Sequence, residues 1–493
     1  AGRRYLTSYK IRSLHVFWHN DTTIIIRDEN PERKGMGAKQ RIYTAGVLYY
    51  TVLEIRTDFR KGRQEDVMER NDPRYQAYVE ILKEELIPAM GCTEPIALAY
   101  AAAKAREVLG VLPDSVQLQV SGSIIKNVKS VIVPNTGHLK GMEAAVAAGI
   151  IAGSAEKELE VISEVSEEKK SAIRDYLQTV PITIEHTEQG HVFDIVVTER
   201  CGQDYARVRI ADYHTNICRI EKNGTVLYEV PLLDETVQED ARADRSLLNM
   251  QDIWDFAETA DLRDVADLLE RQIRYNNAIA EEGLLGDYGA NIGRVLLTTY
   301  GNDVSNRAKA KAAAGSDARM NGCELPVIIN SGSGNQGITC SVPLIEYAKE
   351  LHSGKEKLYR ALIISNLVAI HEKTGIGTLS AYCGAVSAGA GAGAGIVYLC
   401  GDGYQAAIHT VVNALAIVSG IVCDGAKASC AAKIASSVDA ALLGYNMYKC
   451  NQEFKGGDGI VMKDIETTIK GIGRLGKDGM RQTNEEIIRL MMS

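Results

Sequence analysis

The sequence predicts an α+β fold with two parts: a large, mostly helical domain with buried helices rich in glycine and alanine, and a smaller α/β domain nearer the N-terminus. The helical part is predicted from the run between Thr374 and Cys423, in which Asp402 is the only acidic or basic side chain. Small uncharged residues indicate helices that pack closely inside a core. The α/β part is predicted from residues 113–232, where β-branched runs such as SVQLQVSGS and HVFDIVVTE alternate with helical segments such as EEKKSAIRDYLQT.

Length and charge limit the classes of function. The chain has 493 residues, 45% of them apolar, which is enough for a sizeable core and for more than one domain. The formal net charge of -9 argues against nucleic acid and anionic membranes as partners, because both require a basic face. Ten cysteines are too sparse for a disulfide scaffold in a chain of this size, so the expected compartment is the reducing cytoplasm. Nothing in these features sets the oligomeric state, and a homo-oligomer stays open.

Residues 1–67 differ in composition from the rest of the chain. They contain 13 Lys and Arg against 8 Asp and Glu and show no sustained helical or strand period, whereas Met68 opens a stretch typical of a protein start. We expect residues 1–67 to be an extension that is disordered or not native. A mitochondrial-type presequence, the alternative, needs fewer acidic residues.

Cys92 lies at the start of a predicted helix. The motif GCTEP, residues 91–95, follows a helical stripe that ends near Pro88 and precedes the alanine-rich run IALAYAAAKAREVLG. A helix N-terminus stabilises a thiolate, so Cys92 is a candidate reactive cysteine. An ordinary loop cysteine is the plainer alternative.

The central hypothesis concerns Cys383, Cys423 and Cys430, which lie at the ends of apolar runs, where ligands for a buried inorganic centre converge. Seven residues on one helix would place Cys423 and Cys430 about 10 Å apart along the axis. The helix must therefore break between them, and Gly425 supplies a residue that turns without steric cost. Buried core cysteines are the alternative, because no compact ferredoxin spacing is present.

A membrane span was weighed for the same region. Gly403 to Cys423 is a run of 21 residues without a formal charge, long enough to cross a bilayer. Polar residues interrupt the run, however, and no flanking basic cluster or aromatic belt marks an interface. Buried helices in a large core are the better prediction.

A glycine-rich motif, SGSGNQG at residues 331–337, is the second candidate site. A strand-like run precedes it and a helix follows, and its glycines have the GxGxxG spacing of a dinucleotide-binding turn. The acidic residue that such a site needs about 20 residues further on is missing, because Glu372 comes too late. Successive backbone N–H groups at a helix start also bind other anions, including an amino-acid carboxylate.

Five motifs together resemble the L-cysteine desulfidase family, and the last third of the chain is similar to the iron–sulfur L-serine dehydratase alpha domain. The motifs are GCTEP (91–95), SGSIIKNVKSVIVPNTG (121–137), SGSGNQG (331–337), LSAYCGAVSAGAGAGAG (379–395) and CDGAKASCA (423–431). The resemblance covers residues 68–493. It implies a 4Fe-4S enzyme that converts L-cysteine to pyruvate, ammonia and sulfide without pyridoxal phosphate. L-serine, eliminated by the same mechanism, is the alternative substrate.

The resemblance also implies roles for individual residues. Cys383, Cys423 and Cys430 look like the cluster ligands, and Cys92 looks like the family's catalytic or fourth cysteine. With three thiolate ligands one iron stays open to act as a Lewis acid. We expect the Cys92 thiolate to be the base, with Lys427 as the alternative.

The expected substrate contacts come from two regions. The glycine-rich motif would hold the substrate carboxylate, and loops of the α/β domain would close the pocket; the residues are Ser331, Ser333, Gly334, Asn335, Gly337, Asn127, Thr136 and Lys140. Residues 247–493 would form the helical iron–sulfur catalytic domain, with residues 68–112 as part of it. Three other functions stay open: a pyridoxal phosphate lyase that uses Lys427, a nicotinamide dehydrogenase and a non-catalytic iron–sulfur sensor.

Overall fold

The computed structural model describes residues 68–187, 191–232, 242–377 and 379–492, together with the backbone of four strands nearer the N-terminus. The chain divides into two compact units, Ala1–Val67 and Met68–Ser493. The first unit contains an antiparallel sheet whose strands follow one another in chain order. Its strands are β1 (Ser8–Ile11), β2 (Leu14–Trp18), β3 (Thr23–Asp28) and β4 (Arg41–Thr44). The sequence pattern does not predict these strands, because the segment shows no sustained alternation.

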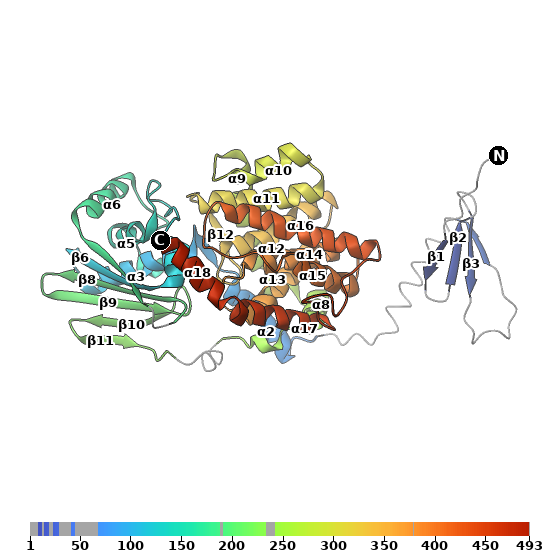
Figure 1. Cartoon of the computed structure of the whole chain (residues 1–493), viewed down its shortest axis with the longest axis horizontal. Helices are drawn as coiled ribbons and strands as arrows, with labels where there is room; N and C mark the ends of the chain where they lie inside the picture. The colour runs from blue at the N-terminus through green and yellow to red at the C-terminus, as the bar shows by residue number, and fades with distance from the viewer. Residues whose placement is uncertain are drawn as a thin grey trace. The chain divides into compact units, whose positions relative to one another are not determined.

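The second unit combines a helical domain with a mixed sheet, which confirms the predicted α+β class (Figure 1). In the sheet β6 pairs with β7 in parallel, and every other neighbouring pair is antiparallel. The strand order is β11-β10-β9-β8-β6-β7. The strands are β6 (Ser115–Ser121), β7 (Ile182–Thr187), β8 (Asp194–Cys201), β9 (Asp204–Ala211), β10 (Ile217–Lys222) and β11 (Thr225–Glu229).

Helix α3 packs between the sheet and α5. It packs against β8 and β9 on one side and against α5 on the other. The α3–α5 contact is close because Gly149 of α5 lies against the α3 backbone, where a Cβ atom would come within 2.1 Å of the Ala99 carbonyl oxygen. The helices here are α3 (Thr93–Leu109), α4 (Gly122–Val128), α5 (Gly141–Ala152) and α6 (Glu167–Thr179).

The helical domain is built around α14, the glycine- and alanine-rich helix (Figure 1). A Cβ atom on Gly391 would lie 2.4 Å from the Ser365 carbonyl oxygen of α13, and one on Gly389 would lie 2.8 Å from Ser437 of α16. The glycines therefore let two neighbouring helices approach α14 closely. The helices of this domain are α2 (Pro73–Glu85), α8 (Met250–Thr259), α9 (Ala266–Leu285), α10 (Ile292–Tyr300), α11 (Val304–Met320), α12 (Gly334–Glu350), α13 (Lys355–Ile376), α14 (Gly384–Cys400), α15 (Tyr404–Val418), α16 (Ser429–Lys449), α17 (Ile465–Arg474) and α18 (Arg481–Met492).

A two-stranded sheet joins distant parts of the chain. β5 (Pro88–Met90) pairs antiparallel with β12 (Pro326–Ile328). The pairing brings the GCTEP motif, which follows β5, beside the glycine-rich motif, which follows β12. It also counts against the dinucleotide interpretation, because that turn belongs to a parallel sheet.

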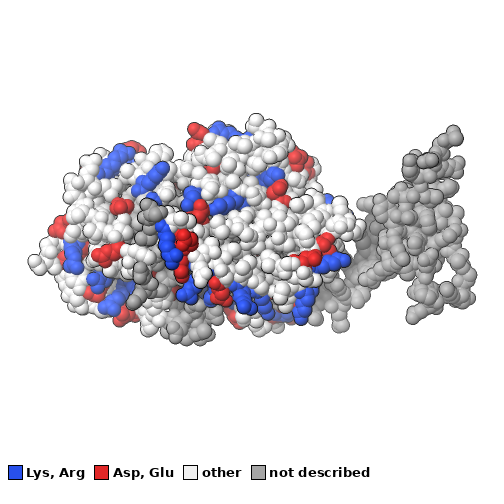
Figure 2. Space-filling view, viewed as in Figure 1, with Lys and Arg blue, Asp and Glu red and all other residues white. Residues whose placement is uncertain are grey.

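The apolar run between residues 403 and 423 does not form one long helix. Helix α15 ends at Val418 and α16 begins at Ser429, so Cys423 and Cys430 do not lie on one continuous helix, as the spacing predicts. Among the described helices none is both long and apolar enough to cross a bilayer. Basic and acidic side chains lie intermixed over the face shown in Figure 2.

Glu199, on β8, is fully buried, and neither of its carboxyl oxygens has a hydrogen-bond partner. Burial raises the pKa of Glu199 from 4.5 to about 9, and the positive charge of Arg106 opposes the shift only in part. The folded protein therefore holds this proton more tightly than the unfolded chain does. It follows that stability falls as the pH rises from 4.5 towards 9.

We expect Glu199→Gln to stabilise the protein at pH 8 and to leave it unchanged at pH 4.5. Glutamine keeps the shape of the protonated side chain and cannot ionise, so the melting temperature at pH 8 should rise by at least about 2–4 °C. Thermal unfolding at both pH values measures this. Glu185→Gln, at an exposed position of β7, is the control and should show no pH-dependent difference. Equal melting temperatures for Glu199→Gln and wild type at pH 8 would contradict the prediction.

Candidate functional site

One cavity of about 900 Å³ collects most of the predicted site residues. It lies among the start of α3, the glycine-rich loop before α12, the end of α13 and the loops that precede α14 and α16. All four cysteines singled out in the sequence line it: Cys92, Cys383, Cys423 and Cys430. Asn127 and the loop residues Ser331, Ser333 and Asn335 line it as well.

An isolated β-bridge places Cys383 beside Cys423. Tyr382 and Val422 pair antiparallel, and each cysteine directly follows a bridge residue. The Cys383 N–H donates to the Ile421 carbonyl at 3.1 Å, and the Cys423 N–H donates to the Ala381 carbonyl at 2.6 Å. Backbone bonds therefore hold Cys383 and Cys423, which are 40 positions apart in the sequence, as diagonal neighbours across one short antiparallel pair.

Gly425 shapes the loop between Cys423 and Cys430. Its φ of +93° lies in the region that favours glycine, and a Cβ atom there would fall 2.2 Å from the Lys126 carbonyl oxygen of α4. The loop is thus pressed against α4. The Cys430 thiol, in the first turn of α16, lies 3.6 Å from the Gly425 carbonyl oxygen.

Two lysines lie near the three cysteines that are the expected cluster ligands. All three thiols are free; Lys126 is buried and Lys373 is partly exposed. Burial lowers the pKa of Lys373 to about 8, while Cys423 and Cys383 act in the opposite direction. In the part of the chain that the structure describes, no three His, Cys, Asp or Glu side chains are grouped to hold one metal ion. A four-iron cluster is wider than an ion, so its thiolate ligands lie farther apart.

Cys92 occupies the N-cap position of α3, and its thiol is hydrogen-bonded to an acidic neighbour. Its thiol donates to Glu94 Oε2 at 3.1 Å. Burial raises the pKa of Cys92 well above 9, Glu94 raises it further, and the nearby Arg319 lowers it. Burial and Glu94 thus oppose the thiolate that the helix N-terminus is expected to stabilise.

Glu94 is a site residue that the sequence reasoning missed, although it belongs to GCTEP. It accepts hydrogen bonds from Cys92, from Thr93 and from Asn127 Nδ2, the last at 2.8 Å. Burial works against ionisation of Glu94, but His214 and the Cys92 thiol outweigh burial and lower the pKa to about 2. The cavity therefore holds a buried carboxylate.

His214 is one of the residues that the six-stranded sheet and its loops contribute to the cavity. It lies in the connection between β9 and β10, and its ring packs edge-on against Phe193 with centroids 4.7 Å apart. His214 Nε2 is 4.0 Å from Glu94 Oε1 and has no hydrogen-bond partner. No sequence motif surrounds this histidine, so only the fold reveals it.

The glycine-rich loop has an unusual backbone conformation and packs closely against its neighbours. Ser331 has a φ of +48°, a conformation that costs energy for a residue with a side chain and is often found at functional sites. Gly334 and Gly337 do not line the cavity; they allow close packing instead. A Cβ atom on Gly334 would lie 2.3 Å from Arg319 Nε, and one on Gly337 would lie 2.0 Å from the Ile328 carbonyl oxygen.

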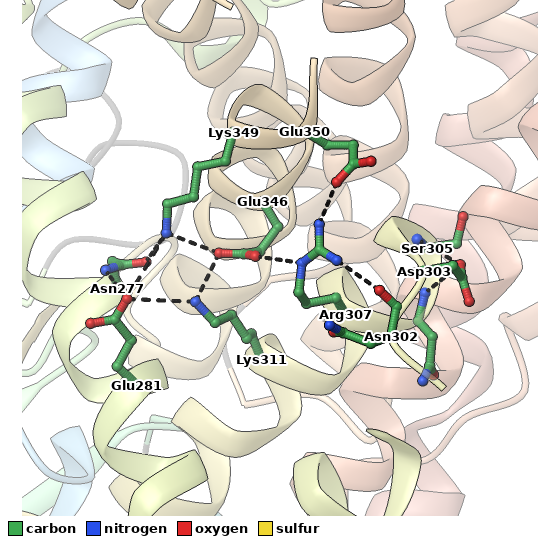
Figure 3. Close-up of polar contacts among 11 residues, drawn as sticks. Asn277, Glu281, Asn302, Asp303, Ser305, Arg307, Lys311, Glu346, Lys349 and Glu350 are labelled. Atoms are coloured by element: carbon green, nitrogen blue, oxygen red, sulfur yellow. Dashed lines mark hydrogen bonds and ion pairs between the residues drawn. The ribbon is translucent and has the colours of Figure 1, made fainter. Parts of the chain in front are cut away.

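Arg319, in the last turn of α11, is the second residue that the sequence reasoning missed. It lines the cavity and is 3% exposed, and its Nη1 donates to Asn335 Oδ1 at 3.2 Å. Its position depends on how α11 packs against α12. At the far end of this helix pair, Figure 3 shows buried Glu346 of α12 accepting from Arg307 and Lys311 of α11, at 3.0 and 2.9 Å. These ion pairs hold the two helices together away from the cavity.

Sequence comparisons agree with this architecture. A family model for the serine dehydratase alpha chain matches residues 156–489. The chain belongs to this family. It is 61% identical to a UPF0597 protein of Desulfitobacterium hafniense, with 86% of this chain and 99% of the relative covered. It is 52% identical to a UPF0597 protein of Lachnoclostridium phytofermentans, with 85% of this chain and 100% of the relative covered.

The family assignment confirms the expected relation to the serine dehydratase alpha domain. At this level the protein is serine dehydratase-like, which indicates a lyase, and its family is related to iron–sulfur serine dehydratases. A small-molecule substrate accords with such a family and with a cavity of about 900 Å³.

Besides Gly334 and Gly337, three more predicted residues of this serine dehydratase-like chain do not line the cavity. The Thr136 hydroxyl donates to the Val133 carbonyl at 2.7 Å and closes a turn. Lys140 is exposed at the start of α5. Lys427 pairs with Asp424 at 3.4 Å, which favours a charge-balancing role and weakens the pyridoxal phosphate interpretation.

Proposed function

We propose that the protein catalyses α,β-elimination of L-cysteine to pyruvate, ammonia and sulfide, with a 4Fe-4S cluster bound by Cys383, Cys423 and Cys430. The observation that carries the proposal is the convergence of these three free thiols with Cys92 and a wall of buried polar side chains on one cavity. The family match supports a lyase. When bound, the cluster would supply an open iron that acts as a Lewis acid.

In this proposal the Cα–H and Cβ–S bonds of the substrate break. The proton leaves from Cα, the sulfur leaves as sulfide, and water then converts the resulting enamine to pyruvate and ammonia. Oxidation states balance without any external electron donor or acceptor.

Cys92 is the proposed base. Burial, and to a lesser degree the adjacent Glu94, raises the pKa of its thiol in the ligand-free protein. A substrate ammonium group next to Glu94 offsets the negative charge of that carboxylate and so lowers the pKa of Cys92. The thiolate therefore forms when substrate is present. Lys427 remains the alternative base, although its ion pair with Asp424 lies outside the cavity wall.

Ser331, Ser333 and Asn335 are proposed to orient the substrate. They lie on the loop at the start of α12, whose backbone is held by the β5–β12 pairing. Asn127 approaches from α4, beside the Gly425 loop.

L-serine is the second candidate substrate, and the family match favours it. It has the same skeleton as L-cysteine with a hydroxyl group in place of the thiol. A pocket separates the two through its contacts with the leaving atom.

The test is protein purified without oxygen, as wild type and as Cys423→Ser. We expect about four irons and an equal amount of acid-labile sulfide per chain in wild type. We also expect pyruvate release from L-cysteine or L-serine, and loss of both iron and activity in Cys423→Ser. Cys450→Ser, at an exposed free cysteine, is the matched control and should retain both. An active protein that contains no iron would refute the cluster, and an iron-loaded wild type that releases pyruvate from neither amino acid would refute the reaction.

A further inference from the structure

The cavity contains a buried positive charge that the protein itself does not neutralise. Arg319 is 3% exposed, and among the described residues no Asp or Glu forms an ion pair with it. Its Nε atom also has no hydrogen-bond partner. Two other arginines of the same cavity, Arg242 and Arg245, are both paired with Glu84 and Glu85. A buried guanidinium whose hydrogen-bond acceptor is a neutral amide, and not a carboxylate, is costly, which points to an anionic ligand at Arg319.

The cavity also contains a buried negative charge that no described Lys or Arg neutralises. Glu94 is 8% exposed and accepts hydrogen bonds from the neutral donors of Cys92, Thr93 and Asn127. Within the described ranges no Lys or Arg pairs with it, and His214 is 4.0 Å away. This arrangement points to a cationic ligand at Glu94.

Unused hydrogen-bond acceptors lie on the same wall. Asn127 Oδ1 and Gln336 Oε1 are buried, line the cavity and have no partner in the protein. An ammonium group offers three N–H donors and no acceptor, so a carboxylate and two amide oxygens suit it. Both side chains influence the pKa of Cys92, which Glu94 raises and Arg319 lowers, so both lie near the Cys92 thiol.

We propose that the site recognises the zwitterion of an α-amino acid, with Arg319 binding the carboxylate and Glu94, assisted by Asn127, binding the ammonium group. The proposal rests on the proposed function and extends it, because it assigns the substrate carboxylate to a side chain of α11 as well as to the glycine-rich loop. A compound that lacks either charge leaves one buried ion unpaired and is rejected for that reason.

Binding of unreactive probes tests the proposal without turnover. L-alanine has no leaving group, L-alaninamide lacks the carboxylate charge, and L-lactate lacks the ammonium group. Calorimetric titration of the anaerobically purified holoprotein should show that wild type prefers L-alanine to both analogues. Arg319→Gln should bind L-alanine at least about 30-fold more weakly, because it removes one partner of a buried charge pair.

The ratios of affinities distinguish recognition from a structural role. Arg319→Gln should lose the preference for L-alanine over L-alaninamide and keep the preference over L-lactate. Glu94→Gln should show the reverse. Arg294→Gln is the matched control, because it removes a guanidinium of α10 that pairs with Asp287 and does not line the cavity, and it should bind like wild type.

The recognition proposal and the proposed function fail separately. Two results would overturn the recognition proposal whatever the enzyme catalyses. One is an Arg319→Gln variant that binds L-alanine as tightly as wild type does, and the other is a wild-type protein that binds L-alanine and L-alaninamide equally well. The expected ratios support it even when wild type releases no pyruvate from L-cysteine or L-serine, a result that refutes only the reaction.

Discussion

Substitution of Cys92 by serine is expected to abolish elimination while the iron content stays at the wild-type level. A positioned base contributes about 10²–10⁴-fold to the rate, and a serine hydroxyl cannot take over a thiolate's proton transfer near neutral pH. We therefore expect kcat to fall by at least about 100-fold. The measurement is pyruvate release under anaerobic conditions, with iron determined on the same sample.

The pH dependence gives an independent check on Cys92. Burial and Glu94 raise the pKa of its thiol well above 9 in the ligand-free protein, so the deprotonated fraction grows as the pH rises. We expect kcat/KM of wild type to increase through the alkaline range, because this parameter reports the free enzyme. Cys201→Ser, at a half-buried cysteine at the end of β8, is the control and should keep the profile. Loss of iron from Cys92→Ser would mean that Cys92 holds the cluster and is not the base.

Gly425→Ala is expected to displace the loop that carries Cys423 and Cys430, and so to prevent cluster binding. The added Cβ atom would lie 2.2 Å from the Lys126 carbonyl oxygen, and the φ of +93° alone disfavours alanine by roughly 1–2 kcal/mol. A backbone oxygen inside α4 has little freedom to move, so the loop must shift. We expect iron content to fall below half that of wild type, measured on anaerobically purified protein.

Gly420→Ala is the matched control for this loop. Gly420 lies in the same connection between α15 and α16, and no other heavy atom lies within 4 Å of the position that its Cβ would take. It should retain iron and activity. Circular dichroism of both variants separates a local shift of the loop from unfolding. A fully iron-loaded Gly425→Ala protein would show that this close approach does not set the cysteine geometry.

The sequence predicts the helices and loops that carry the site residues better than it predicts how these segments come together in the fold. Apolar runs and small residues indicate buried helices around Cys383, Cys423 and Cys430, and the spacing of the last two requires the break that α15 and α16 show. The bridge between Tyr382 and Val422 has no sequence signal, because a single pair of residues lacks the alternation that marks a strand. Tertiary packing alone brings Cys383 to Cys423.

The charged residues of the cavity are also hard to predict from the sequence. Glu94 is recognisable only through its place in GCTEP, and Arg319 and His214 belong to no motif. A buried arginine and an exposed one look alike in a sequence, because solvent exposure of a polar side chain is decided by neighbours far along the chain. Thr136 is the opposite case. It lies in a motif of the family and is expected from the sequence to contact substrate, yet its hydroxyl donates a hydrogen bond to a backbone carbonyl within a turn.

The pairing of β5 with β12 sets a condition on how the protein is made. The ribosome releases Met90 and Cys92 long before it reaches Pro326, and at about 5–20 residues per second this interval is on the order of tens of seconds. Throughout it β5 lacks its partner strand, and Thr93, beside Cys92, lacks the Gly332 carbonyl that it later bonds. The nascent chain therefore presents the Cys92 thiol to solvent before the cavity exists, and a reducing environment during synthesis preserves that thiol.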